Sequence, residues 1–210
     1  MNILDIHTHH LKENVSQYIY SCIPSAFYPQ KGGYYSVGIH PWYINSETRN
    51  EYEYLKKIGS HPQIIAIGEA GLDKTISIDL SFQQEIFKLQ IELSETLGKP
   101  LIIHSVKTSN EIIQLKKELR PKSPWIIHGF RGKKELAEQY TAQDIYLSFG
   151  EKYQKDALNS IPLDHLLLET DESDKEILRI YESVANSRSL PTEQLVAQIQ
   201  QTISQLFFNR

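Results

Sequence analysis

Ile64-Ile65-Ala66-Ile67-Gly68-Glu69 is an apolar run that stops at an acidic side chain. A near-continuous apolar run of this length is typical of a parallel strand covered on both faces. Similar runs recur in both directions along the chain, separated by segments with helical spacing. The predicted strands are Ile3–His7, Tyr34–Ile39, Ile64–Gly68, Pro100–His104, Trp125–His128, Ile145–Ser148 and His165–Glu169, with a weaker candidate at Gln17–Ile23.

The segments between the strands predict amphipathic helices. Three of them begin with a serine or threonine followed three residues later by glutamate or glutamine, which is the spacing of a capping box. These pairs are Ser81 with Gln84, Thr108 with Glu111 and Ser173 with Glu176, and a closing helix is predicted at Thr192–Leu206.

Strand–helix alternation predicts an α/β fold with a parallel sheet, either doubly wound or closed into a barrel. Eight possible strands favour the barrel. The 210 residues lie near the short end of the roughly 200 to over 400 residues of this fold. The segment Leu11–Gly33 is too short for a full helix with its strand and loops. We therefore expect a distorted, shortened TIM (β/α) barrel forming one domain over residues 1–210, with its active site at the carboxyl ends of the strands.

The composition and the start of the sequence indicate the expected location of the protein and its partners. The chain has no apolar run of about 18 residues that would span a membrane, and its start at Met1 shows no secretory signal. The single cysteine, Cys22, excludes an intrachain disulfide and fits a reducing cytoplasm. A net charge of −4 does not indicate a broad nucleic-acid surface. We expect a cytoplasmic protein with no membrane partner and no evident obligate protein partner.

Histidines and carboxylates stand where the predicted strands end. Because these ends converge on one face of a barrel, residues far apart in sequence are expected to share one cavity. Imidazole and carboxylate groups suit divalent metals, and such ions lower the pKa of bound water from about 15.7 towards 7. Each residue alone is also compatible with a structural role, but the set predicts a metal site. The predicted ligands are His7, His9, Glu69, His104, His128 and Asp171.

Several motifs resemble, in order, those of the TatD family of metal-dependent hydrolases. The motifs are Asp5-Ile6-His7-Thr8-His9, Gly38-Ile39-His40-Pro41, Ile67-Gly68-Glu69-Ala70-Gly71-Leu72-Asp73, Ile102-Ile103-His104-Ser105, Ile127-His128-Gly129-Phe130-Arg131-Gly132 and Leu168-Glu169-Thr170-Asp171.

The resemblance implies an amidohydrolase-type barrel that hydrolyses phosphodiesters, typically DNA, with two divalent ions such as Mg²⁺, Mn²⁺ or Zn²⁺. It implies that His7, His9, Glu69 and Asp171 hold one ion, and that Glu69, His104 and His128 hold the second. Asp171 would be the general base and Glu69 the bridging carboxylate. It also implies that His40 contacts substrate phosphate. The alternative for His40 is a structural role as a loop histidine held rigid by Pro41. Asp73 is expected to be a turn residue or to support a ligand.

The chain departs from the family pattern on the substrate side. The family often has arginine where Val106 stands, and a longer proline-containing loop after the aspartate that matches Asp171. Basic residues near three strand ends offer compensation, so we expect Lys107 and Arg131 to bind substrate, with Lys133, Lys134, Lys152 and Lys155 as further candidates or solvated helix residues. Tyr34, Tyr35 and Trp42 are expected to pack in the core or at the barrel rim, with base stacking as the alternative.

Three functions fit these residues. The leading hypothesis is a deoxyribonuclease that uses metal-activated water. The second is a metal-dependent hydrolase of a small amide, ester, lactone or phosphate, because the same ligands serve carbonyl attack. The third is a metal-binding relative without catalytic activity.

Overall fold

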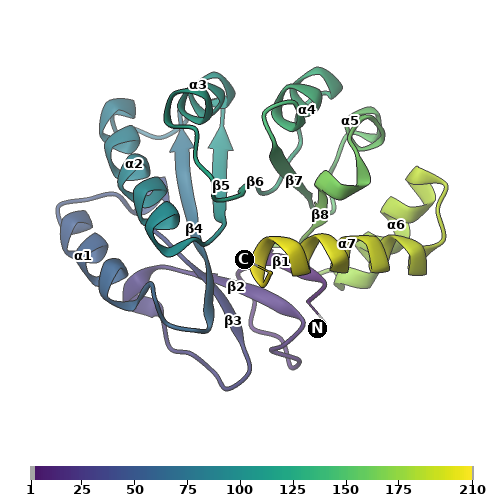
Figure 1. Cartoon of the computed structure of the whole chain (residues 1–210), viewed down its shortest axis with the longest axis horizontal. Coiled ribbons are helices and arrows are strands. Elements are labelled where there is room, and N and C mark those ends of the chain that lie inside the picture. Colours follow the sequence, from purple (N-terminus) through teal and green to yellow (C-terminus); the bar gives the residue numbers. More distant parts are fainter. Residues whose placement is uncertain (1–2, 210) are drawn as a thin grey trace.

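The computed structural model describes residues 3–209, and its centre is an eight-stranded parallel sheet in the order β1 to β8. Each strand pairs with its neighbours in sequence, and the helices lie around the outside (Figure 1). The strands are β1 (Asp5–Thr8), β2 (Tyr18–Cys22), β3 (Tyr34–Val37), β4 (Ile64–Asp73), β5 (Leu101–Val106), β6 (Trp125–Ile127), β7 (Ile145–Phe149) and β8 (Leu166–Leu168).

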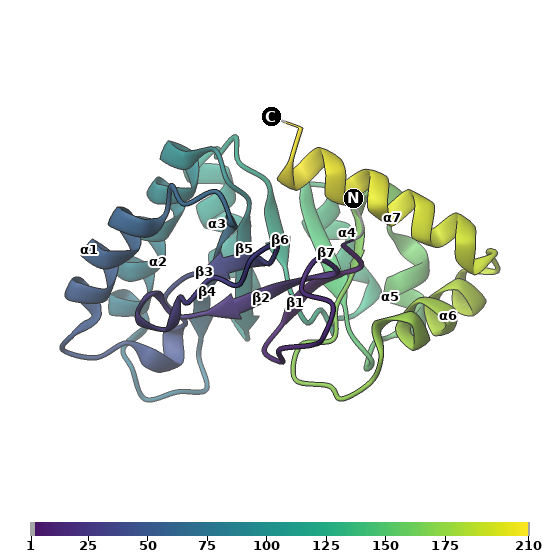
Figure 2. The ribbon, with the colours of Figure 1, turned by 90° about the horizontal axis from the view of Figure 1, so that it is seen from below.

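The helices follow the strands from β3 onward. The α-helices are α1 (Thr48–Ile58), α2 (Leu80–Leu97), α3 (Ser109–Leu119), α4 (Lys134–Thr141), α5 (Lys155–Ser160), α6 (Ile177–Arg188) and α7 (Thr192–Phe207). Short 3₁₀ helices occur at η1 (Pro24–Ala26), η2 (Pro41–Tyr43) and η3 (Leu163–His165). Helix α7 lies beside α6 (Figure 2) and also packs against β8. None of the helices in residues 3–209 is long and apolar enough to cross a membrane.

The first and last strands close the sheet into a nearly complete barrel. Thr8 forms a parallel bridge with Asp171, just beyond β8. The Asp171 N–H donates to the His7 carbonyl at 2.9 Å, and the His9 N–H donates to the Asp171 carbonyl at 3.2 Å. All ten residues of β4 are buried, which explains its continuous apolar composition. The fold is the expected TIM barrel.

The barrel is shortened where the sequence suggested. Between β1 and β3 the described chain contains β2 and the 3₁₀ helix η1 but no α-helix (Figure 1). The weaker strand candidate is confirmed as β2. The strand predicted at Ile64–Gly68 is longer than expected, because pairing with β5 continues to Asp73.

Two predicted helix starts were wrong. Helix α2 is capped by Asp79, whose carboxylate accepts from the Ser81 N–H at 2.8 Å, and not by Ser81. Helix α6 begins at Ile177, because Ser173 lies in a loop where its hydroxyl donates to Glu151 at 2.8 Å. Thr108 does stand at the N-cap of α3, but its hydroxyl donates to the Leu72 carbonyl at 3.1 Å instead of capping the helix.

Candidate metal-dependent active site

Glu69 is held in the middle of the site by the glycines on either side of it. Gly68 and Gly71 have φ angles of 133° and 152°. A Cβ on Gly71 would lie 2.0 Å from the His104 carbonyl oxygen, and one on Gly68 would lie 2.5 Å from that of Ile102. Only glycine lets β4 approach β5 so closely in this conformation. The Gly-Glu-Ala-Gly segment therefore delivers a buried carboxylate to the carboxyl end of the barrel.

The two oxygens of Glu69 face different groups of histidines. Oε2 lies 3.3 Å from His7 Nε2 and 3.2 Å from His9 Nε2. Oε1 lies 2.8 Å from His104 Nδ1, 2.7 Å from His128 Nε2 and 3.1 Å from His40 Nε2. The Glu69 carboxylate therefore lies between two groups of histidines, one at each of its oxygens.

Asp171 lies on the side of Oε2. Its Oδ1 is 3.8 Å from His7 Nε2 and 3.9 Å from His9 Nε2. Its position follows from barrel closure, since its backbone pairs with β1 on both sides. The side chain is partly exposed, at 23%, and it lines three cavities of about 510, 330 and 500 Å³. Asp171 is thus the ligand-type group best placed to meet both a cation and a substrate.

The chemistry of these groups fits divalent metals. His7 is fully buried, yet neither of its ring nitrogens has a hydrogen-bond partner among residues 3–209, and such a buried polar group without a partner is costly unless it is a ligand. Burial acts to raise the pKa of Glu69, but the charge of His128 and the hydrogen bonds with His104 and His128 hold that pKa well below its usual range. Ligand atoms lie within 4.8 Å of one another in three groups: His7, His9 and Glu69; His7, His128 and Asp171; and His40, Glu69 and His104.

Two further carboxylates lie behind the predicted ligands. Asp73 Oδ2 is 3.3 Å from His104 Nε2, and Glu169 Oε1 is 3.4 Å from His128 Nδ1. Burial acts to raise the pKa of Asp73, but hydrogen bonds from Thr75 and Trp42 lower it to about 2. A carboxylate on the second ring nitrogen fixes the orientation of a ligating histidine and makes it a stronger ligand.

Two buried glutamines of α2 fix the strand ends that carry site residues. Gln90 accepts from the Ile39 N–H at 2.7 Å and donates to the Ile39 carbonyl at 3.1 Å, directly before His40. Gln83 makes the same pair of bonds with the backbone of Asp73, at 2.8 and 3.0 Å. These side chains substitute for missing backbone partners where the strands leave the sheet.

The structure brings all six predicted ligands together. His40, predicted to contact substrate, lies among the ligands and lines the cavity of about 330 Å³. Lys107 and Arg131 both line the cavity of about 500 Å³, so they stand beside the ligand cluster without belonging to it. Tyr35 is buried and Tyr34 packs against Phe208, whereas Trp42 is 58% exposed.

Sequence reasoning missed the supporting residues, namely Asp5, Gln83, Gln90 and Glu169. A signal was present for Glu169, which stands two residues before Asp171 and directly follows three leucines at the end of a predicted strand. The two glutamines interrupt the buried face of α2, which is a second signal, because a buried polar side chain needs a partner.

Comparison with known proteins finds one matching family and relatives named as a metal-dependent hydrolase and a nuclease. The family described as TatD related DNase matches residues 22–208. The metal-dependent hydrolase YabD of Bacillus subtilis, itself uncharacterised, is 32% identical over 147 residues, covering 66% of this chain and 58% of that protein. The human 3'-5' RNA nuclease TATDN2 is 30% identical over 154 residues, covering 65% of this chain and 19% of that protein.

A solved structure shares the fold across the whole barrel. The TatD homologue YJJV of Escherichia coli superposes with a TM-score of 0.85 at 18% identity, covering 98% of this chain and 97% of that one. The chain spans little more than half the length of the curated relatives it matches first, at 58% and 54%. Since the family match extends over most of the described barrel, the chain belongs to the TatD related DNase family.

Proposed function

We propose that this chain is a divalent-metal-dependent phosphodiesterase that hydrolyses DNA. The observation that carries the proposal is the position of the Glu69 carboxylate between two sets of histidines, with Asp171 on one side. The name of the family and the nuclease activity in the name of TATDN2 support the choice of a phosphodiester.

Divalent ions bound at this cluster would supply Lewis-acid stabilisation of the phosphoryl oxygens and an acidified water. His7, His9 and Asp171 would hold one ion, His104 and His128 the other, and Glu69 would contact both. Asp171 accepts the proton of the attacking water, because its carboxylate is the partly exposed one that opens to the cavities. His40 completes the second set or contacts the phosphate, and its neutral form suits either role, since burial lowers its pKa.

The test is hydrolysis of a fluorescent DNA oligonucleotide by protein first freed of metal and then supplied with Mg²⁺, Mn²⁺ or Zn²⁺. We expect nucleotide release that requires metal and stops with chelator. An RNA of the same sequence and a panel of small phosphates and carboxylic esters run in parallel. Turnover of a panel member, with no cleavage of DNA under any metal, would overturn the proposal.

A small-molecule hydrolase is the second candidate, and a specific feature favours it. Val106 stands where the family often has an arginine, and the cavities around Asp171 have volumes of about 330 to 510 Å³. Small-ligand sites typically enclose about 300–1,000 Å³. The same panel separates the two candidates.

A further inference from the structure

Trp42 is an exposed aromatic residue that is nevertheless held in place. Its side chain is 58% exposed, yet its Nε1–H donates to Asp73 Oδ2 at 2.7 Å. Its ring centroid is 5.0 Å from that of His40 and 6.0 Å from that of His104. The indole therefore stands at the edge of the ligand cluster with a fixed orientation and an open face. A ring fixed in this way loses little entropy when a planar group stacks on it.

The cavity beside Trp42 has two basic residues, Lys107 and Arg131, among its lining groups. Trp42, Arg131, His128 and Asp171 all line this cavity of about 500 Å³. Arg131 is exposed, and no ion pair occupies its guanidinium within residues 3–209. The cavity thus joins an aromatic surface, the ligand cluster and, in Arg131, a cation that no carboxylate of the described residues neutralises.

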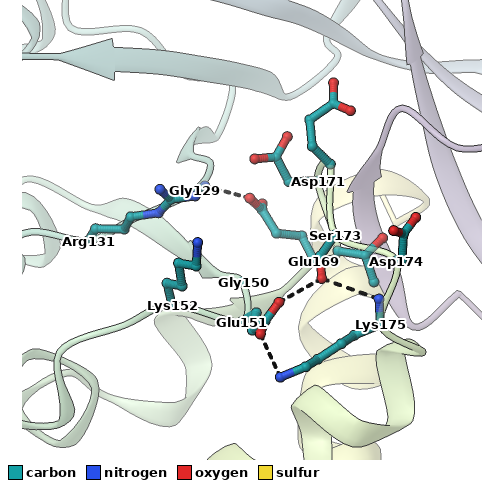
Figure 3. Close-up of a pocket in the computed structure, with 12 residues that line it drawn as sticks. Gly129, Arg131, Gly150, Glu151, Lys152, Glu169, Asp171, Ser173, Asp174 and Lys175 are labelled. Carbon is teal, nitrogen blue, oxygen red and sulfur yellow. Dashed lines mark hydrogen bonds and ion pairs between the residues drawn. The ribbon is translucent and has the colours of Figure 1, made fainter.

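Arg131 also borders a second cavity, which extends the basic surface. It lies next to Lys152 there, with Asp171 across the opening (Figure 3). The third cation of this cavity, Lys175, is paired with Glu151 at 2.6 Å. In this second cavity, Arg131 and Lys152 are therefore the cations available to bind an anionic ligand.

We propose that Trp42 and Arg131 bind the nucleotide next to the scissile phosphodiester. The indole stacks on the base of this nucleotide, and the guanidinium contacts its phosphate. Both groups border the cavity that Asp171 and His128 line, so a nucleotide bound there would have its linkage at the ligand cluster. The inference rests on the proposed function, because it assigns the neighbouring subsite of the same site. It also gives a role to Arg131 that compensates for the absence of arginine at position 106.

The fluorescence of the protein allows a direct test. The chain has two tryptophans, of which Trp125 is fully buried and serves as an internal reference. Zn²⁺-loaded protein is titrated with a 5'-phosphorylated thymidine dinucleotide whose linkage is a phosphorothioate, which slows hydrolysis. We expect quenching of the solvent-exposed emission and unchanged emission from the buried indole. Equal quenching by an abasic sugar phosphate would overturn the stacking.

Calorimetry of variants separates stacking from the hydrogen bond to Asp73. Trp42→Ala and Trp42→Phe both lose that hydrogen bond, but only the second keeps an aromatic face. We expect Trp42→Ala to weaken dinucleotide binding about 10-fold, equivalent to about 1.4 kcal/mol, and Trp42→Phe to stay within about 2-fold of native. Zn²⁺ affinity should be equal in the two variants. Equal loss of dinucleotide affinity in both, or no binding to the native protein, would overturn the proposal.

Arg131→Gln is expected to weaken binding of the phosphorylated dinucleotide about 5- to 10-fold and to leave the unphosphorylated one unchanged. Lys117→Gln is the matched control, because it removes one positive charge from an exposed position on α3 that lines neither cavity. If DNA is hydrolysed with an unchanged KM in Trp42→Ala and Arg131→Gln, the subsite is wrong and the proposed function stands. If no DNA is hydrolysed while Trp42→Phe binds the dinucleotide more tightly than Trp42→Ala, the subsite is supported and the proposed function is wrong.

Discussion

The carboxylate of Asp5 accepts two hydrogen bonds from Thr170, one from the backbone N–H at 3.0 Å and one from the hydroxyl at 2.6 Å. Lys12 Nζ donates to Asp5 Oδ2 at 2.9 Å and to the Thr170 hydroxyl at 2.8 Å. Asp5 precedes His7 by two residues, and Thr170 directly precedes Asp171. This buried contact therefore determines how the two ends of the barrel present their ligands to each other.

Replacing Asp5 by Asn is expected to lower both stability and metal affinity. The new amide N–H₂ would face the Lys12 ammonium and the Thr170 hydroxyl, where an acceptor is required. Since Lys12 is partly exposed, we expect a loss of about 2 kcal/mol in the free energy of unfolding, measured by urea denaturation, together with weaker Zn²⁺ binding in calorimetry. Glu13→Gln, an exposed acid in the same loop, should change neither quantity. Native stability in Asp5→Asn would show that the contact is dispensable.

Metal removal should destabilise the barrel, because the cluster joins strands from both ends of the sheet. Binding at 100 times Kd contributes about 2.7 kcal/mol, which corresponds to a rise in Tm of roughly 5–10 °C for a chain of this size. The measurement is Tm by differential scanning fluorimetry with Zn²⁺ or with chelator. The shift should shrink in His7→Gln and persist in His165→Gln, a histidine paired with Asp144 and Asp164 outside the cluster. An equal shift in all three proteins would place the metal elsewhere.

Asp171→Asn is expected to lower kcat for DNA about 10²- to 10⁴-fold, because an amide cannot accept the proton of the attacking water. KM should change little, since the oxygen that faces His7 and His9 is retained. Glu172→Gln, the exposed neighbour, provides the control. Unchanged kcat in Asp171→Asn would assign the proton transfer to another group.

Asp73→Asn tests the support of His104. Loss of the carboxylate behind a ligating histidine typically costs about 10- to 100-fold in metal affinity or activity. We expect this loss in Zn²⁺ titrations, with little change in the far-ultraviolet circular dichroism spectrum. Asp144→Asn removes an exposed carboxylate that pairs with His165 and should leave Zn²⁺ affinity unchanged. If Asp73→Asn keeps the native Zn²⁺ affinity, the role of Asp73 is limited to its hydrogen bond with Trp42.

Gln90→Leu tests the glutamine contacts of α2. The substitution leaves the N–H and carbonyl of Ile39 buried without partners, and each orphaned group costs about 1–3 kcal/mol. We expect a loss of roughly 2–4 kcal/mol in the free energy of unfolding. Gln139→Leu, on the exposed face of α4, should have a much smaller effect. Equal losses in the two variants would mean that apolar substitution itself, and not the Ile39 contact, is responsible.

The barrel could be predicted because its strands are apolar runs that end at ligand-type residues. Glu69, His104 and His128 each close such a run, and the convergence of parallel strands makes them neighbours. The start of α6 could not be predicted from its capping-box spacing, since Ser173 fits a loop equally well: its hydroxyl accepts from the Lys175 N–H at 3.2 Å.

The residues that hold the ligands in place could not be predicted from the sequence, for a different reason. Asp5 acts through Thr170, 165 positions away, and Gln90 acts through Ile39, 51 positions away. Local spacing carries no information about such pairs. Trp42 was expected to pack in the core or at the rim, yet its side chain is 58% exposed, and Asp73 holds its indole beside a cavity.

The pairing of β1 with the segment after β8 also has a consequence for how the protein matures in the cell. The ribosome releases His7 and His9 first and Asp171 last, so a growing chain carries an incomplete set of ligands until nearly all of its strands have emerged. Uptake of the cation at the completed cluster would then coincide with the final step of assembly. Starvation for metal would consequently leave newly made chains, rather than mature ones, open to proteolysis.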